Sequence, residues 1–373
     1  MTGSAPFDPL DPADARDLTG HTGPEGPSGS SGPSRPMVPS DPGDPRDPGD
    51  PRDPVAAHDP HPTLDPHAAH GPHPALDPRS VFRPRLPSPV RELADGRFER
   101  YGVRLLVKRD DLIHPDLVGN KWRKLAPNLA AAAGRTVVTF GGAYSNHLRA
   151  TAAAGRLLGL PTVGVVRGQE LADRPLNASL ARCAADGMRL RFVDRSTYRR
   201  LPEPATLAAV LRAADATRAY VVPEGGSNAL AVRGCRALGA ELRGHADVVG
   251  VACGTGGTLA GLAAGLGREQ RALGVAVLGG GFLGRHTAAL QEAAFGHRVG
   301  AWSVEDRFAF GGYARVPPAL DAFAADFEDR HGVPVERLYV AKLLYGLLAL
   351  TEEGAFPRGT TVAAVITGAP FAG

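Results

Sequence analysis

Proline is distributed very unevenly along this 373-residue chain, and this limits where the chain can build a core. Of its 34 prolines, 22 stand in residues 1–90. Each proline removes a backbone donor and fixes φ, so such a segment cannot propagate helices or central strands. Residues 41–54 read DPGDPRDPGDPRDP, a repeat that has no side chains with which to build a core. We therefore predict that residues 1–80 are disordered or extended in a polyproline style.

Residues 81–373 are rich in Ala, Gly and Leu, which suits two ordinary domains or one large bilobed enzyme. The net charge of +3 is small and Arg is scattered, so nucleic acid is not an expected partner. No apolar run reaches about 18 residues, so no membrane span is expected. The amino terminus has no apolar signal core, so secretion is not expected either.

Cysteines and clustered histidines are the residues of this chain that could form disulfides or bind a metal. The three cysteines have no metal-ligand spacing and cannot all pair, which indicates a reducing cytoplasm. Neutral imidazole is a common metal ligand. The simpler interpretation of the tail histidines is biased composition, so no metal is assigned. These histidines are His58, His61, His67, His70 and His73.

Short β-branched runs alternate with Ala- and Leu-rich helical stretches after the tail, which predicts an α/β fold with mainly parallel, twisted sheets flanked by helices. Open sheets of this kind bind ligands at the carboxyl ends of their strands. The expected strands are 105–108, 137–140, 162–166, 190–193, 220–222, 248–252, 275–278 and 362–366. The expected helices are 121–133, 145–158, 177–186, 205–214, 227–242 and 258–266.

Three glycine-rich turns follow predicted strands. In the first, GGAYSNH, Ser145 and Asn146 open a helix whose free amides favour an anion such as a carboxylate, although Ser145 could equally be a simple helix cap. The second, CGTGGT from Cys253, has backbone amides and two Thr hydroxyls suited to a phosphate. Cys253 itself reads as a small packed residue more than as a nucleophile. The third, EGGSN from Glu224, is by itself only a turn with a capping side chain.

Lys121 stands at a helix start in the segment GNKWRKL, three residues before Lys124 on the same helix face. The positive end of the helix dipole repels an ammonium there and should lower the pKa of Lys121. A lowered pKa is what a Schiff-base lysine requires. Taken alone, however, this lysine fits a solvated basic helix face better.

The order of these segments is more specific than any one of them. KRDDL, GNKWRKL, TFGGAYSNH, VPEGGSNA, CGTGGT and ITGAP, running from about Leu86 to the carboxyl terminus, resemble the 1-aminocyclopropane-1-carboxylate (ACC) deaminase / D-cysteine desulfhydrase family. These enzymes depend on pyridoxal 5′-phosphate (PLP) and have the tryptophan-synthase-β fold, PLP fold type II. The resemblance implies a large domain of residues 81–127 and 223–373, a small domain of residues 128–222, and a homodimer.

The resemblance also implies cofactor contacts. Lys121 matches the Schiff-base lysine, and Lys124 matches a residue near the phosphate. Asn146 matches the amide that bonds the phenolic oxygen, and Thr367 would face the pyridine nitrogen. A neutral Thr cannot hold a proton on that nitrogen as a carboxylate can, which favours elimination over long-lived carbanion chemistry. The phosphate cradle would be Gly254, Thr255, Gly256, Gly257 and Thr258.

On the substrate side, Ser145 matches the hydroxyl that meets the substrate carboxylate, with Asn146 and His147 beside it. Tyr313 and Tyr339 match two active-site tyrosines, either of which could act as general acid or position the leaving group. The expected reaction is α,β-elimination from a small amino acid such as D-cysteine. Lys121 removes the α-proton and a thiol such as sulfide departs. Water then hydrolyses the released aminoacrylate to pyruvate and ammonia.

Two departures from the family pattern leave the substrate open. Where ACC deaminases have SNQ and Tyr-Glu-Gly-Lys, this chain has His147 and Tyr339-Val340-Ala341-Lys342. The missing Glu argues against cyclopropane ring opening to 2-oxobutanoate, which remains the alternative. Two further alternatives are a dinucleotide-binding oxidoreductase that uses the CGTGGT loop and a PLP-binding protein without catalysis. The former lacks a fitting acidic residue about 20 positions after the loop.

Overall fold

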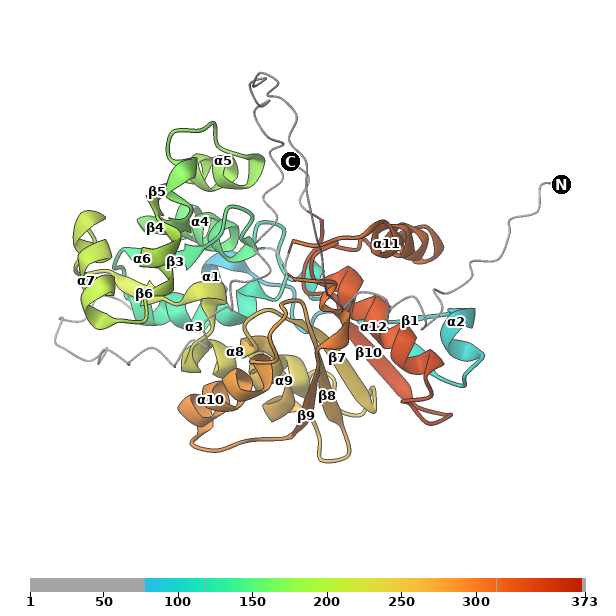
Figure 1. Cartoon of the computed structure of the whole chain (residues 1–373). Coiled ribbons are helices and arrows are strands. Elements are labelled where there is room, and N and C mark those ends of the chain that lie inside the picture. Colours follow the sequence, from blue (N-terminus) through green and yellow to red (C-terminus); the bar gives the residue numbers. More distant parts are fainter. Residues whose placement is uncertain (1–77, 118, 313, 371–373) are drawn as a thin grey trace, which may run out of the picture. The chain divides into compact units, whose positions relative to one another are not determined.

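Two β-sheets organise the part of the chain that the computed structural model describes, residues 78–370 without 118 and 313 (Figure 1). All neighbouring strands are parallel except the pair β1–β2. The larger sheet has the order β1(Val90–Leu93)-β2(Arg104–Lys108)-β10(Thr361–Val365)-β7(Val248–Cys253)-β8(Arg271–Ala276)-β9(Ala301–Glu305). The smaller has the order β5(Met188–Val193)-β4(Thr162–Arg167)-β3(Val137–Gly141)-β6(Tyr220–Val222).

The eight predicted strands are all present, and the mainly parallel α/β class is confirmed. The prediction placed β8 too late, since this strand begins at Arg271 and not at 275. Strands β1 and β9 were missed. Both lie at the edges of the larger sheet and are largely exposed, so their sequences VREL and AWSVE lack the continuous apolar run that marks a buried parallel strand.

The six predicted helices are present with ends that differ by no more than two residues. They are α3 (Lys121–Ala132), α4 (Asn146–Leu158), α5 (Ala178–Ala185), α7 (Pro204–Ala213), α8 (Ala229–Ala240) and α9 (Gly257–Gly265). The helices not predicted are α1 (Pro78–Phe82), α2 (Gly96–Glu99), α6 (Arg195–Arg199), α10 (Leu283–Phe295), α11 (Pro318–His331) and α12 (Val340–Glu352). Short 3-10 turns lie at η1 (Asp110–Leu112), η2 (Gln169–Leu171), η3 (Glu224–Gly226) and η4 (Arg307–Ala309).

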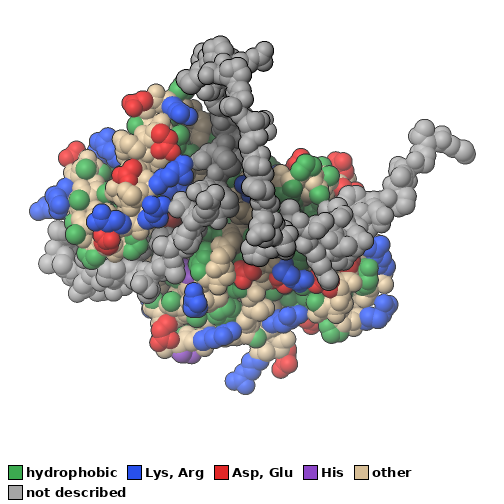
Figure 2. All heavy atoms as spheres, in the orientation of Figure 1, with side chains coloured by type: hydrophobic (Ala, Val, Ile, Leu, Met, Phe, Trp, Pro, Cys, Tyr) green, Lys and Arg blue, Asp and Glu red, His purple; other side chains and the backbone are tan. Residues whose placement is uncertain are grey.

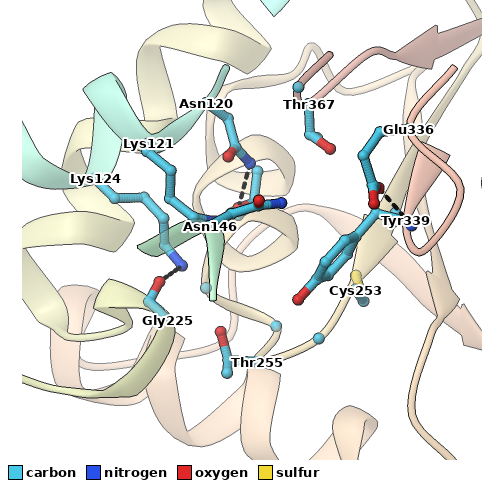
Figure 3. A pocket seen from close by; sticks show the side chains of 16 residues that line it. Asn120, Lys121, Lys124, Asn146, Gly225, Cys253, Thr255, Glu336, Tyr339 and Thr367 are labelled. Atoms are coloured by element: carbon cyan, nitrogen blue, oxygen red, sulfur yellow. Dashed lines mark hydrogen bonds between the residues drawn. The ribbon is translucent and has the colours of Figure 1, made fainter. Parts of the chain in front are cut away.

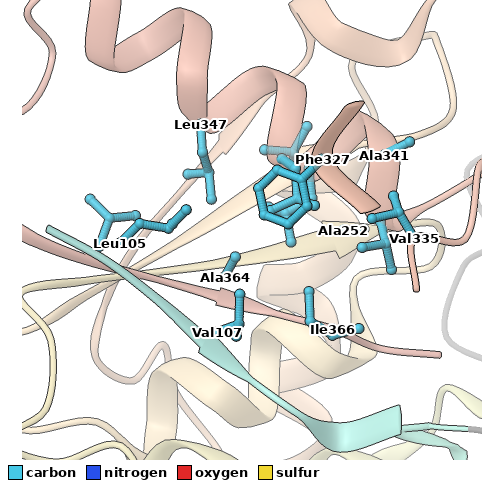
Figure 4. Packing of buried hydrophobic residues seen from close by; sticks show 14 of the residues in the cluster. Leu105, Val107, Ala252, Phe327, Val335, Ala341, Leu347, Ala364 and Ile366 are labelled. Atoms are coloured by element: carbon cyan, nitrogen blue, oxygen red, sulfur yellow. The ribbon is translucent and has the colours of Figure 1, made fainter. Parts of the chain in front are cut away.

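Helices cover both faces of the larger sheet, and its strands alternate accordingly. Leu105 and Val107 of β2 pack with α11 and α12, whereas Leu106 between them packs with α8 and α9. The same alternation in β10 sends Ala364 to the first face and Val365 to the second. Figure 4 shows the first of these cores, where Phe327 and Leu347 lie over the sheet. The central strands β7 and β10 are therefore buried on both faces of the sheet.

The smaller sheet is covered in the same way. Val137 and Val222 pack with Trp122 and Leu125 of α3 on one face. On the other, the core contains Val138, Phe140, Val163 and Val165 with the side chains of α6 and α7. The apolar side of α3 thus packs against the smaller sheet. The first residue of this helix, Lys121, lies at the carboxyl ends of the strands.

The tail prediction lies almost wholly outside the described residues, as do its five histidines; of residues 1–80 only 78–80 are described, and they begin α1. The described residues fall in one compact unit, so the division into a large and a small domain stays a prediction. No helix within residues 78–370 is both long and apolar enough to cross a membrane.

On the face drawn in Figure 2, Lys and Arg side chains of the described residues are interspersed with Asp and Glu. Several arginines pair with carboxylates, such as Arg104 with Glu92 at 2.7 Å and Arg307 with Glu353 at 3.0 Å. Positive charge is therefore not gathered into one patch on that face.

Candidate active site

A pocket opens at the carboxyl ends of strands from both sheets (Figure 3). Its walls come from the starts of α3 and α4, the turn after β6, the loop between β7 and α9, the segment before α12 and the segment after β10. The sequence predicted ligand binding at such strand ends. The lining residues are Asn120, Lys121, Lys124, Asn146, Gly225, Ala252, Cys253, Gly254, Thr255, Gly256, Gly257, Thr258, Glu336, Tyr339, Thr367 and Gly368.

Lys121 is brought to this pocket by a tight turn. Gly119 has φ +65°, and an added Cβ there would lie 1.6 Å from the carbonyl oxygen of Thr367, so only glycine fits. The amide of Asn120 donates to that same carbonyl at 3.1 Å. The GNK and ITGAP segments are thus in direct backbone contact, and α3 begins at Lys121 itself.

Both lysines of α3 have lowered pKa values. Burial disfavours the ammonium of Lys121, and the Arg149 guanidinium adds repulsion. Burial, with repulsion from Lys121, lowers the pKa of Lys124 to about 7. The direction predicted for Lys121 is therefore confirmed, but burial is the main cause, whereas the prediction rested on the helix dipole.

Lys124 leads a chain of hydrogen bonds into the predicted phosphate cradle. Its Nζ donates to the carbonyl of Gly225 at 2.6 Å and to Ser227 Oγ at 2.8 Å. Ser227 Oγ lies 2.6 Å from Thr255 Oγ1. Because an ammonium only donates, Ser227 Oγ accepts from Lys124, and the Ser227 hydroxyl can donate to Thr255 Oγ1. The Thr255 hydroxyl can then donate to a ligand in the pocket. The third glycine turn, which by itself looked like a simple turn, therefore supports the second.

The cradle is the loop that starts α9. Gly256 caps this helix with φ +70°, and an added Cβ at Gly257 would lie 2.6 Å from Ser227 Oγ. Thr258 Oγ1 accepts a hydrogen bond from Asn120 Nδ2 at 3.0 Å. All five predicted cradle residues, Gly254 to Thr258, line the pocket. Backbone and side chains thus enclose a small volume at a helix amino terminus.

The SNH segment begins α4, but its three side chains have different surroundings. Ser145 is the helix cap: its Oγ accepts from the amide of Leu148 at 3.2 Å, and it does not line the pocket. Asn146 does line it. His147 is 2 % exposed with its ring against Gly226, and among the described residues neither ring nitrogen has a partner. Burial lowers its pKa well below the usual value, so the imidazole is neutral. The substrate roles of Ser145 and His147 stay predictions.

The remaining wall contains Tyr339, Glu336 and Thr367 (Figure 3). In that view Thr367 lies on the side of the pocket away from Thr255. Glu336 Oε1 accepts from the amide of Leu338 at 2.9 Å and Oε2 from the amide of Tyr339 at 2.7 Å, so this carboxylate caps the approach to α12. Tyr313 lies outside the described residues.

Sequence reasoning missed three residues of this site: Asn120, Ser227 and Glu336. Asn120 and Ser227 belong to segments that it did recognise, GNK and EGGSN, but their contacts depend on chain segments far away in the sequence. Glu336 had a usable signal, since an acidic residue shortly before an apolar helix is favourable near its free amides. That helix, α12, was itself not predicted.

The pocket fits PLP. The first amides of α9, the hydroxyls of Thr255 and Thr258 and the Lys124 ammonium suit a phosphate dianion, and the close approach at Gly257 leaves no room for a side chain. Lys121 is the lysine with which an aldehyde would react. The Glu336 carboxylate is held by backbone amides, and the remaining polar side chains of the lining are neutral or basic.

A model of the family "Pyridoxal-phosphate dependent enzyme" matches residues 82–368. A "putative 1-aminocyclopropane-1-carboxylate deaminase" of Pyrococcus horikoshii is 30% identical over 72% of this chain and 83% of its own length. A "D-cysteine desulfhydrase" of Yersinia pestis is 38% identical over 48% of this chain and 57% of its own length. The crystal structure of an ACC deaminase homologue superposes with a TM-score of 0.64 and 27% identity, covering 79% of this chain and 94% of that one. The predicted fold type is confirmed.

Proposed function

The chain belongs to the pyridoxal-phosphate-dependent enzyme family, and we propose that it catalyses α,β-elimination from a small amino acid, releasing a thiol, pyruvate and ammonia in the manner of D-cysteine desulfhydrase. The observation that carries the proposal is the convergence of Lys121, the Lys124–Ser227–Thr255 chain and Thr367 on one pocket. The family match argues against the dinucleotide-binding alternative.

Two positions favour elimination over ring opening. Val340 stands where the resemblance places the Glu of ACC deaminases, and its apolar side chain is fully buried at the start of α12. Thr367, which would face the pyridine nitrogen, lines the pocket with a neutral hydroxyl. A pyridine nitrogen that faces a neutral hydroxyl is a weaker electron sink than one that faces a carboxylate, which suits a reaction whose leaving group departs promptly.

The chain's own residues divide the remaining work. When bound, PLP withdraws electron density from the α-carbon of the substrate. Lys121 accepts the α-proton on Nζ, and its lowered pKa keeps more of the free amine available near neutral pH. The Tyr339 phenol donates a proton to the departing thiolate or positions it. Ser145 stands outside the cofactor lining but next to Asn146, and its Oγ accepts from Leu148, so its hydroxyl can still donate to the substrate carboxylate.

The test is product analysis on the purified full chain with a panel of D- and L-amino acids and the cyclopropane amino acid. We expect pyruvate, ammonia and sulfide in equal amounts from D-cysteine, and no products with Lys121→Ala. Absence of sulfide and pyruvate from both cysteine enantiomers would overturn the elimination proposal. Release of 2-oxobutanoate from the cyclopropane substrate would support the second candidate, which the name of the Pyrococcus relative favours.

A third outcome is a protein that binds PLP without turning over any amino acid, which would indicate a cofactor-binding homologue. The proposal also includes the location of the enzyme in the cell and its oligomeric state. We place the enzyme in the cytoplasm, which three free, buried cysteines support. We also expect a homodimer, on the family resemblance alone, and the molecular mass in solution tests it.

A further inference from the structure

A buried arginine stands behind the pocket, on the helix that carries Asn146. Arg149 lies three residues after Asn146 in α4 and is 8% exposed. Its Nη1 donates to Ser179 Oγ at 2.8 Å, and Ser179 is itself buried near the start of α5. Its Nη2 donates to Asn146 Oδ1. The arginine does not line the pocket, so its effect on a ligand would pass through Asn146.

The chemistry of the guanidinium decides which way the Asn146 amide faces. A guanidinium has five N–H donors and no acceptor. The amide atom next to it must therefore be the oxygen, which is the only acceptor of an amide side chain. The Asn146 nitrogen, with both of its protons, is then left for the pocket. Without this constraint the terminal torsion of Asn has a broad, roughly two-fold preference, and either end could face inward.

We propose that Arg149 is a positioning residue that fixes the Asn146 amide with its nitrogen as a donor toward the phenolic oxygen of PLP. In Figure 3 the Asn146 side chain reaches into the pocket between Lys121 and Tyr339. A planar guanidinium with two partners holds this orientation better than a flexible ammonium would. Its Nη1 is fixed by Ser179 while its Nη2 donates to Asn146. The inference rests on the cofactor, which the family match shows, and not on the substrate.

The experiment is a double-mutant cycle on PLP affinity, measured by absorbance titration of the cofactor-free full chain. Arg149→Met removes the donors but keeps an unbranched apolar chain, and Asn146→Ala removes the amide. Each should weaken binding on the order of tenfold, the loss of one hydrogen bond to a charged oxygen. The double variant should bind no more weakly than Asn146→Ala alone, because Arg149 acts through that amide.

The matched control is Arg156→Met on the same helix. Arg156 is partly exposed and pairs with Asp116 and Asp186, so its loss should leave PLP affinity unchanged. Effects of Arg149→Met and Asn146→Ala that add, or an Arg149→Met affinity equal to that of the parent, would overturn the proposal. If Arg149→Met does not fold, Arg149→Lys enters the same cycle under the same criterion. The measurement of PLP affinity does not require turnover, so it can be interpreted even if the elimination proposal fails.

Discussion

The two ends of the pocket differ in how fully they are built before any ligand arrives. At the cradle end, Lys124, Ser227 and Thr255 are joined by hydrogen bonds of 2.8 and 2.6 Å, and Asn120 holds Thr258 at 3.0 Å. At the substrate end, Ser145 is engaged as a helix cap, and His147 has no partner on either ring nitrogen among the described residues.

This difference separates affinity from specificity. Groups that are already oriented lose little entropy when an anion binds, so the cradle end should set how tightly the cofactor is held. Groups whose hydrogen bonds are completed only by the substrate can stabilise the transition state more than the ground state. The substrate end should therefore set kcat and the choice of substrate. Substitutions at the two ends are therefore expected to change different quantities.

Lys121 stands between the two ends and should show the largest effect. Lys121→Ala removes the group that binds the cofactor covalently and accepts the α-proton, and general base catalysis alone contributes about 10²–10⁴-fold. We expect keto-acid release to fall by at least about 10³-fold. Borohydride reduction followed by mass spectrometry should show the cofactor attached to the parent chain and not to the variant. A variant with full turnover would contradict the role of Lys121 at both ends.

Tyr339→Phe tests the substrate end. The phenyl ring preserves the packing against Gly254, where an added Cβ would lie 3.3 Å from Tyr339 Cε1, but the variant loses the hydroxyl. We expect kcat to fall about 10²-fold, because the variant cannot donate a proton to the leaving group. PLP affinity should stay unchanged, because the phosphate cradle is intact. Parallel measurements of kcat and of PLP affinity check this. A loss of PLP affinity without a loss of kcat would show that the Tyr339 hydroxyl acts on the cofactor and not on the leaving group.

Lys124→Met tests the cradle end, with an expected loss of PLP affinity of about tenfold. Burial lowers the pKa of Lys124 to about 7, so the free protein carries this charge mainly below pH 7. A phosphate dianion favours the ammonium, so binding above pH 7 takes up a proton and affinity should fall as the pH rises, by at most about tenfold per unit. Titrations between pH 7 and 9 should show this slope in the parent and not in the variant.

The same substitution has a consequence for stability that runs in the opposite direction. The folded pKa of Lys124 lies below its ordinary value, so at neutral pH the unfolded chain binds a proton more readily than the folded one. This lysine therefore destabilises the cofactor-free fold at neutral pH, and Lys124→Met should raise its melting temperature. Such opposed changes in affinity and stability are typical of a residue kept for binding.

The sequence predicted the cradle end better than the substrate end. All five cradle residues line the pocket because a strand, a glycine loop and a helix are contiguous in the chain, so local patterns contain their geometry. Ser227 was missed because its role depends on a contact with Thr255, which belongs to another element. The contacts of Glu336 are local, and this residue was missed because helix α12 was not predicted.

The same reasoning explains the errors in the fold. Central strands such as β7 are continuous apolar runs, and their bounds were nearly correct. The edge strands β1 and β9 were missed because their exposed sides are polar. The directions in which side chains face are not local either. Of the SNH segment at the start of α4, Asn146 lines the pocket, whereas the substrate roles of Ser145 and His147 stay predictions.

Substitution of Cys253 should have the smallest effect. It tests whether a residue that lines the cradle end takes part in the chemistry. Cys253 lines the pocket next to Gly254, yet burial raises the pKa of its thiol to about 12, so almost none is thiolate at neutral pH. We read it as a packing residue: an added Cβ at Gly274 would lie 2.8 Å from its Sγ. Cys253→Ala should lower the free energy of unfolding by about 1 kcal/mol and leave kcat/KM within about twofold of the parent. Denaturant unfolding and initial rates measure the two quantities, and a large loss of rate at unchanged stability would show that the thiol takes part in the chemistry.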